Sequence, residues 1–122
     1  METTLTKPER LSSYGAIRRL FKEGQSGFVY PFRYMFYVED AAQTEAAILF
    51  STPKKFHKRA NKRNTIRRRM REAYRLNKEV LTAPLGSRRI ELALIYSSKT
   101  LHDYKTIEHA LRKSLEQIVA NL

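Results

Sequence analysis

Between Lys54 and Lys78 the chain carries 12 basic residues and a single acidic one, Glu72. So many like charges cannot be buried together, because an unpaired charge taken out of water costs a large free energy. The segment must therefore lie at the surface and can join a core only through its few apolar residues. The rest of the 122-residue chain has 12 basic and 11 acidic residues, so nearly all of the net charge of +12 lies in this segment.

The end of this basic segment has the period of an α-helix. No Gly or Pro interrupts residues 54–83, and Arg and Ala are good helix formers. At 3.6 residues per turn, apolar and cationic side chains fall on opposite sides of the helix. The predicted buried side holds Ile66, Met70, Ala73, Leu76, Asn77 and Val80. The predicted basic side holds Arg63, Asn64, Arg67, Arg68, Arg71, Arg75 and Lys78. Arg69, beside the apolar side, is one turn from Glu72 and can pair with it.

Helices and strands are predicted on both sides of the basic segment. The predicted elements are a helix over Leu11–Glu23, strands over Phe32–Val38, Ala46–Ser51 and Ile90–Tyr96, and a last helix capped by Asp103. Ser12 or Ser13 can cap the first helix, and Gly24 ends it. The last helix has one apolar stripe, formed by Ile107, Ala110, Leu111, Leu115, Ile118 and Leu122. The order α-β-β-(β)-α-β-α, with one further strand not located, indicates an α+β sheet covered by helices.

The length predicts one domain over residues 1–122, with residues 1–9 as a flexible tail. The chain has no cysteine, which removes disulfides, thiolate metal sites and cysteine nucleophiles. Neither a signal peptide nor an apolar run of membrane-spanning length is present, so we expect a soluble cytoplasmic protein.

The basic side of this helix could face water alone, a membrane surface or a nucleic acid. Successive Arg residues four apart repel each other, so a merely solvated helix would normally mix charges of both signs. A membrane-bound helix would need the apolar side that so small a domain requires for its own core. Arg outnumbers Lys from Lys62 onward, and the planar guanidinium binds phosphate with two hydrogen bonds and stacks on bases. The sequence therefore predicts binding to RNA or DNA.

The run Arg63-Asn64-Thr65-Ile66-Arg67-Arg68-Arg69-Met70-Arg71-Glu72-Ala73-Tyr74-Arg75 resembles the Arg-rich signature of the protein subunit of bacterial ribonuclease P. The preceding Pro53-Lys54-Lys55 and the order of the predicted elements agree with that family across most of the chain. The resemblance implies a single domain with the order α-β-β-β-α-β-α, similar to domain 2 of ribosomal protein S5. It also implies that the basic helix forms a left-handed βαβ crossover.

The resemblance further implies a function and its partners. The family assists a catalytic RNA that removes the 5′ leader of precursor tRNA, so the expected partners are that RNA and the precursor, with no membrane and no small-molecule substrate. The expected contacts with the catalytic RNA are Lys54, Lys55, Lys58, Arg59, Arg63, Asn64, Arg67, Arg68, Arg71 and Arg75. The expected cleft for the leader involves Ile17, Phe21, Arg33 and Tyr37.

Some of these residues have simpler interpretations. Phe21 and Tyr37 can be core residues, although Arg33 on the strand face of Tyr37 favours partial exposure. Asn64 can be a helix cap. His57 is expected to extend the basic surface, whereas His102 and His109 are not expected to be ligands or bases.

The acidic residues are dispersed, and no motif of a hydrolase or a metal site is present. We therefore expect no catalytic or metal-binding residue in the protein. The Mg²⁺ of the holoenzyme is expected to be bound mainly by RNA. Two rival functions remain: a structural RNA-binding protein of the ribosomal kind, and a nuclease that acts without RNA.

Overall fold

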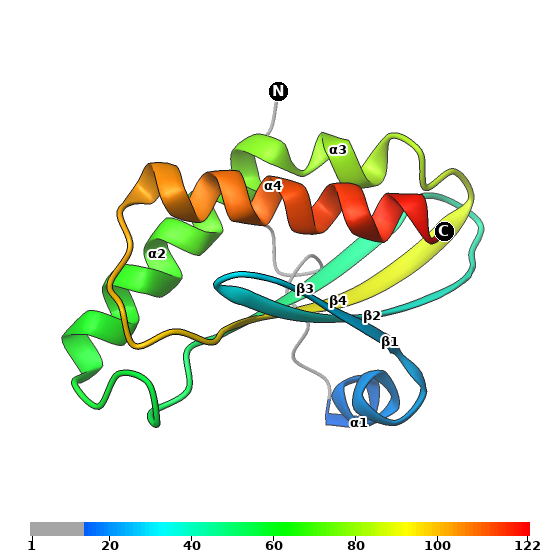
Figure 1. The fold of residues 1–122 in the computed structure, drawn as a ribbon. Helices are drawn as coiled ribbons and strands as arrows, with labels where there is room; N and C mark the ends of the chain where they lie inside the picture. The colour runs from blue at the N-terminus through cyan, green and yellow to red at the C-terminus, as the bar shows by residue number, and fades with distance from the viewer. Residues whose placement is uncertain (1–13) are drawn as a thin grey trace.

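The computed structural model describes residues 14–122, which form one α+β domain. Figure 1 shows a sheet with α2, α3 and α4 on one face and α1 on the other. The elements are α1 (Tyr14–Glu23), β1 (Gln25–Val29), β2 (Phe32–Asp40), β3 (Glu45–Ser51), α2 (Ala60–Asn77), α3 (Glu79–Thr82), β4 (Arg88–Tyr96) and α4 (Tyr104–Ala120). The predicted fold class and order are confirmed, with α3 as an additional short helix. The predicted tail over residues 1–9 and the candidate caps Ser12 and Ser13 lie outside the described residues.

The four strands lie in the order β1-β2-β4-β3. β2 pairs antiparallel with both β1 and β4, whereas β3 and β4 are parallel neighbours. Parallel neighbours need a crossover connection, and α2 with α3 supplies it. The strand that the residue pattern did not locate is β1, a five-residue edge strand around Gly27. Its short length and its glycine give it little of the alternation by which strands are recognised.

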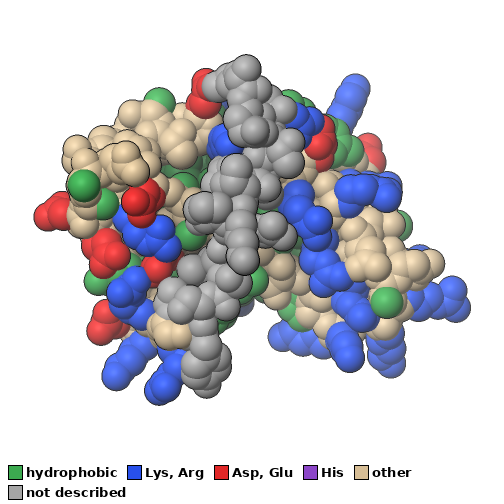
Figure 2. Space-filling model, turned by 180° about the vertical axis from the view of Figure 1, so that it is seen from behind, with side chains coloured by type: hydrophobic (Ala, Val, Ile, Leu, Met, Phe, Trp, Pro, Cys, Tyr) green, Lys and Arg blue, Asp and Glu red, His purple; other side chains and the backbone are tan. Residues whose placement is uncertain are grey.

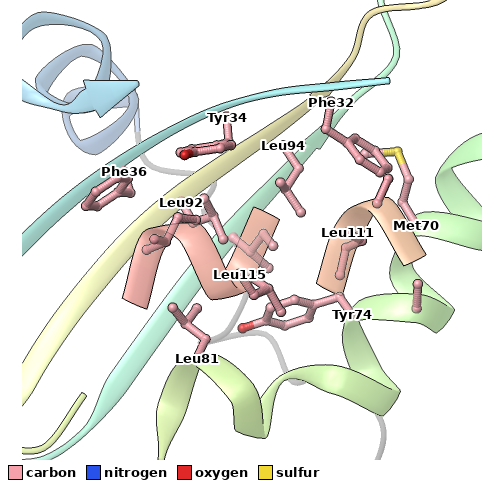
Figure 3. Close-up of a cluster of buried hydrophobic side chains, with 14 of the residues drawn as sticks. Phe32, Tyr34, Phe36, Met70, Tyr74, Leu81, Leu92, Leu94, Leu111 and Leu115 are labelled. Carbon is pink, nitrogen blue, oxygen red and sulfur yellow. The ribbon is translucent and has the colours of Figure 1, made fainter. Parts of the chain in front are cut away.

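The main core lies between the sheet and the three helices α2, α3 and α4. Successive residues of a strand point to opposite faces, so Phe32, Tyr34 and Phe36 of β2 are all buried on this side, as predicted. Figure 3 shows these rings with Leu92 and Leu94 of β4 and with residues of the covering helices. From α4, the predicted stripe residues Ile107, Ala110, Leu111, Leu115 and Ile118 are buried.

A smaller cluster lies on the opposite face, under α1. Leu20 of α1 is fully buried against Ala47 of β3 and Ala93 of β4. Both strand residues are alanines, so their short side chains let the helix approach the sheet closely. Ile17, Met35, Tyr37 and Leu49 are partly buried against this cluster.

Gly24 joins α1 to β1, and the backbone is crowded there. A Cβ atom at this position would lie 2.4 Å from the carbonyl oxygen of Leu20 and 2.9 Å from that of Phe36. Both neighbours are backbone atoms that cannot rotate away. The predicted end of the first helix at Gly24 is confirmed, and close approach explains why glycine is needed.

The predicted buried side of the basic helix needs correction at Leu76. Leu76, expected in the core, is 56% exposed, whereas Tyr74, which was assigned to neither side, is fully buried against the ring of Phe50. The reason is that α2 packs more extensively on α4 than on the sheet. Asn77 accordingly donates to Glu108 and accepts from Arg112, both on α4. The buried side of α2 is therefore rotated toward Tyr74.

The structure fixes the start of the basic helix and corrects two expectations about helix ends. The residues before Ala60 form a turn, in which the amide of Phe56 donates to the carbonyl of Pro53 at 3.2 Å, and the helix begins at Ala60. Asn64 is not a cap, because the helix begins a turn earlier and Arg59 occupies the cap position. Leu122 lies beyond the end of α4 and is 36% exposed, outside the predicted apolar stripe.

Within residues 14–122, none of the helices combines the length and the apolar composition required to cross a membrane.

Candidate nucleic-acid interface

The basic side chains of α2 and of the turn before it gather on one part of the surface. Figure 2 shows this concentration of Lys and Arg on the right of the view, whereas the left carries charges of both signs. We define the basic surface as the predicted set Lys54, Lys55, Lys58, Arg59, Arg63, Asn64, Arg67, Arg68, Arg71 and Arg75. All of these side chains are exposed or half-buried, so the structure brings the predicted contacts together on two adjoining segments.

Two arginines of the helix, Arg68 and Arg71, are available to an external ligand. Both are exposed, and neither makes a hydrogen bond or ion pair with any of the described residues. They are three residues apart on one rigid helix and therefore lie on neighbouring turns. Two such guanidiniums can each accept a phosphate without first breaking an internal contact.

Arg63 and Arg67 are instead held by the protein. Arg63 donates to the carbonyl oxygens of His57 at 3.0 Å and of Lys58 at 2.7 Å, and so ties the basic turn to the helix. Arg67 donates to the side chain of Asn64 and, at 3.3 Å, to the hydroxyl of Thr52. These two arginines shape the basic surface in addition to adding charge to it.

The predicted pair between Arg69 and Glu72 is wrong. Glu72 pairs with Arg75, whose Nε donates to its Oε2 at 3.1 Å. This hydrogen bond holds the pKa of Glu72 below its usual value. Arg69 instead donates to the carbonyl oxygen of His102 at 2.6 Å and links α2 to the loop before α4. The helix reaches this loop because α2 and α4 pack side by side.

His57 does not extend the basic surface, contrary to the prediction. Its side chain is buried, and Nε2 lies 2.8 Å from the carbonyl oxygen of Ser98. The imidazole ring also lies 5.9 Å from the ring of Tyr96. His57 therefore anchors the basic turn to the end of β4. A histidine in a run of cations gives no sign in the sequence that it turns inward.

The four predicted cleft residues lie on the α1 side of the sheet. Ile17 and Phe21 are one turn apart on α1 and line a hollow beside that helix, together with Arg18 and Lys22. Phe21 is 50% exposed, so it is not a core residue. Ile17 is half-buried and packs on the small cluster around Leu20. The structure thus joins these two residues in one apolar wall with cations at its rim.

Tyr37 and Arg33 share one face of β2. The ring of Tyr37 is half-buried against the small cluster, and the guanidinium of Arg19 lies 4.8 Å from its centroid. Arg33 lies about 13 Å away at 3.3 Å per residue. It is exposed and forms no hydrogen bond or ion pair within the described part of the chain. The predicted cleft residues therefore form a line from α1 toward the end of the sheet from which the basic turn leaves.

An ion-pair network at the α1 end of this face was not foreseen. The side chain of Glu91 is only 2% exposed and lies 2.8 Å from Arg19 and 3.5 Å from Arg89. The hydrogen bond with Glu91 raises the pKa of Arg19. A lone glutamate within the apolar strand IELALIY was the available signal, since a buried carboxylate requires a partner.

Among residues 14–122, no three His, Asp or Glu side chains converge in a way that could hold a metal ion. Glu91, the buried carboxylate, is already occupied by two arginines. The described side chains therefore do not fit a metal site held by the protein alone.

Comparison with known proteins identifies what the chain resembles. The family model for ribonuclease P matches residues 5–119. The ribonuclease P protein component of Porphyromonas gingivalis is 39% identical over 121 residues, which span 97% of this chain and 88% of that protein. The component from Chlorobaculum tepidum is 31% identical over 133 residues, spanning 96% and 84%.

Solved structures of ribonuclease P proteins have a similar fold. The ribonuclease P protein of Thermotoga maritima superposes with a TM-score of 0.72 at 26% identity, covering 89% of this chain and 96% of that one. A ribonuclease P protein from Staphylococcus aureus, a mutant with defective mRNA degradation activity, superposes with a TM-score of 0.71 at 20% identity. The superposition covers 93% of this chain and 90% of the Staphylococcus aureus chain. At 20% identity, this similarity supports the fold alone.

Proposed function

The chain belongs to the ribonuclease P protein family, and from this premise we propose that its basic surface binds the catalytic RNA and its α1-side cleft binds the 5′ leader of precursor tRNA. As a ribonuclease P protein component, it is part of an endoribonuclease complex that matures the 5′ end of tRNA. This membership favours the ribonuclease P function over a structural protein of the ribosomal kind.

The observation that carries the proposal for the basic surface is that Arg68 and Arg71 are exposed and make no hydrogen bond or ion pair within residues 14–122. Arginines on an ordinary protein surface acquire acidic neighbours, as Arg75 does with Glu72. Two cations left without a partner on a rigid helix fit an external polyanion. Phosphate binding releases counterions, so the affinity for RNA should fall steeply with salt. If about five to eight phosphates are bound, the slope of log affinity against log salt is about −4 to −7.

The proposal for the leader rests on the line of side chains from Ile17 and Phe21 through Tyr37 to Arg33. Exposed or half-exposed rings suit unstacked bases, and a cation at the end of the line suits the backbone of a single strand. Such a cleft contacts precursor tRNA but has nothing to bind on the mature product. Discrimination between substrate and product follows directly from this difference.

The protein's role in the reaction is to bind and orient. The chemistry belongs to the catalytic RNA with Mg²⁺ held mainly by that RNA, and the protein alone is inactive. The carboxylates of this chain are dispersed, which supports the proposal that the RNA and not the protein holds the catalytic Mg²⁺. The cytoplasmic location expected from the sequence stays a prediction.

Cleavage of a precursor tRNA tests the proposal. A bacterial ribonuclease P RNA is incubated with the precursor at low Mg²⁺, with and without this protein, and the protein is also incubated alone. We expect 5′ cleavage only when protein and RNA are both present. Cleavage by the protein alone would move the chemistry to the protein. No rescue by a folded protein that still binds RNA would favour a structural role.

A further inference from the structure

A row of aromatic side chains, two of them exposed and one half-buried, lies at the end of the sheet, outside the surfaces described so far. We define the aromatic row as Phe28, Tyr30 and His102. Phe28 is 51% exposed and Tyr30 is 55% exposed, although rings of this size are normally covered. The ring centroids of Phe28 and Tyr30 are 6.4 Å apart, and those of Tyr30 and His102 are 5.4 Å apart. Both pairs meet edge to face, so ring faces remain available to a base.

The row is fixed in place by hydrogen bonds. The hydroxyl of Tyr30 lies 2.9 Å from the hydroxyl of Ser98 and 3.2 Å from Nε2 of His102. The amide of His102 donates to the hydroxyl of the buried Tyr96 at 3.1 Å. An exposed tyrosine without a function has no need of such anchors. A ring that is already ordered loses little entropy when a ligand stacks on it.

The row lies beside the proposed leader cleft and is tied to α2, the helix that carries much of the basic surface. At one end, Arg69 of α2 donates to the carbonyl oxygen of His102. At the other end, Phe28 is the register partner of Arg33, the last residue of the proposed leader cleft. Paired residues of neighbouring strands point to the same face, so Phe28 and the exposed Arg33 lie side by side. A single strand that leaves the cleft past Arg33 meets Phe28 and then Tyr30.

We infer that the aromatic row stacks bases of the 5′ leader that lie beyond those held between α1 and Tyr37. The inference rests on the proposed function and extends the leader-binding site across the hairpin between β1 and β2. Ring faces next to an unpaired cation are the combination that binds single-stranded RNA without strict sequence preference. The row would therefore make the affinity depend on leader length more than on leader sequence.

The test uses the reconstituted holoenzyme and precursor tRNAs whose leaders are lengthened one nucleotide at a time. Wild type should gain affinity with each added nucleotide until the row is filled. The double variant Phe28→Ser with Tyr30→Ser should lose the affinity gained from the last nucleotides, at least about 30-fold for the longest leaders if each ring stacks one base. Its affinity for short leaders and for mature tRNA should stay unchanged.

Two control variants separate stacking from folding. Tyr30→Phe removes the hydroxyl but keeps the ring, so it should retain most of the gains for long leaders and lose only the part that depends on the hydrogen bonds to Ser98 and His102. Leu122→Ser removes a different exposed apolar side chain and should have no effect on any leader. As a second measurement, photo-crosslinking from 4-thiouridine placed along the leader of the wild-type complex should modify the peptide containing Phe28 and Tyr30 only from the distal positions.

The outcomes separate this inference from the proposed function. A wild-type holoenzyme that cleaves but shows no dependence on leader length overturns both the leader cleft and the aromatic row. If wild type depends on leader length and the double variant retains every gain, the row alone is excluded. The row would also be excluded if the double variant lost as much affinity for mature tRNA as for precursor tRNA. Crosslinks that never reach the β1–β2 hairpin would exclude it as well.

Discussion

Arg19 Nη2 donates a hydrogen bond of 2.8 Å to Oε1 of Glu91, a carboxylate whose side chain is 2% exposed. The same guanidinium covers the ring of Tyr37. One ion pair thus connects α1 to β4 and also positions the aromatic residue of the proposed leader cleft on β2.

Arg19→Met should lower both the melting temperature and the affinity for precursor tRNA. It leaves Glu91 buried with only Arg89, at 3.5 Å, as a partner. We expect a fall of several degrees in Tm, measured by thermal unfolding. Adding Glu91→Leu should restore most of the Tm, because an apolar pair tolerates burial that a lone charge does not. A double variant that is less stable than Arg19→Met would contradict this account of the pair.

Arg68→Ala with Arg71→Ala should reduce the salt dependence of binding to ribonuclease P RNA. Each phosphate contact that is lost lowers the magnitude of the log–log slope by about one, so the double variant should lower it by about two. Folding should be intact, because both side chains are exposed and neither has a partner among the described residues. Lys105→Ala with Lys113→Ala on α4 removes the same charge from two exposed positions and should leave the slope close to wild type. An unchanged slope in the Arg variant would exclude α2 from the interface.

Tyr37→Ala should weaken the holoenzyme's binding to precursor tRNA while sparing mature tRNA. Loss of one base stack corresponds to roughly 1–3 kcal/mol. Tyr37→Phe keeps the ring beneath Arg19 and is the matched control. Binding constants for both RNAs decide the role of the residue: equal losses for precursor and product would assign Tyr37 to the fold.

Gly24→Ala should destabilise the protein by about 1–3 kcal/mol, the typical cost of forcing extra atoms into a packed region. The new methyl group would press on the carbonyl oxygens of Leu20 and Phe36. Urea unfolding measures the change in free energy. Gly86→Ala is an instructive comparison, because the space around Gly86 is open and its cost should arise from its positive φ of 65° alone. A neutral Gly24→Ala would show that α1 can move away from the sheet.

Asp103 should make the stability depend on pH in the acid range. Its side chain accepts from the amide of Thr106 at 2.9 Å, and hydrogen bonds from Thr106 hold the pKa of Asp103 below its usual value. A lowered pKa in the folded state means that this stabilisation is complete above the unfolded pKa of about 3.9. It is lost as the pH falls through the folded value.

Thermal unfolding of wild type and Asp103→Asn checks this dependence. The Asn variant keeps an oxygen that can cap α4 but has no carboxylate to titrate. The Tm of wild type should exceed that of the variant near neutral pH, and the difference should shrink as the pH falls below about 4. A difference that stays constant through the acid range would show that the charge of Asp103 contributes nothing.

The sequence predicted the large elements of this fold because each has a clear period. The alternation along Phe32–Val38 separates the core rings from Arg33 and Tyr37 correctly. β1 was not located, because five residues with a central glycine carry no such pattern. The helical period also could not place Tyr74, since the buried side of α2 depends on its packing against α4, which is a tertiary relationship.

The sequence also predicted which cations gather in the candidate site but not how they are used. Charge alone does not separate Arg68, which is unpaired, from Arg63, which donates to two backbone carbonyls of the basic turn. His57 turns inward because a carbonyl of the distant Ser98 lies within reach of its imidazole. Partners 41 residues apart become visible only when the chain is folded.

The basic surface and the proposed leader cleft are built on one sheet, and β3 serves both. Ala47 of β3 supports Leu20 beneath the cleft, and the same strand leads directly into the basic turn and α2. Any influence of one ligand on the other through this shared strand is a thermodynamic coupling between two binding sites. Linkage makes this coupling reciprocal. The factor by which the catalytic RNA tightens the protein's hold on a leader is the factor by which a bound leader tightens its hold on the catalytic RNA.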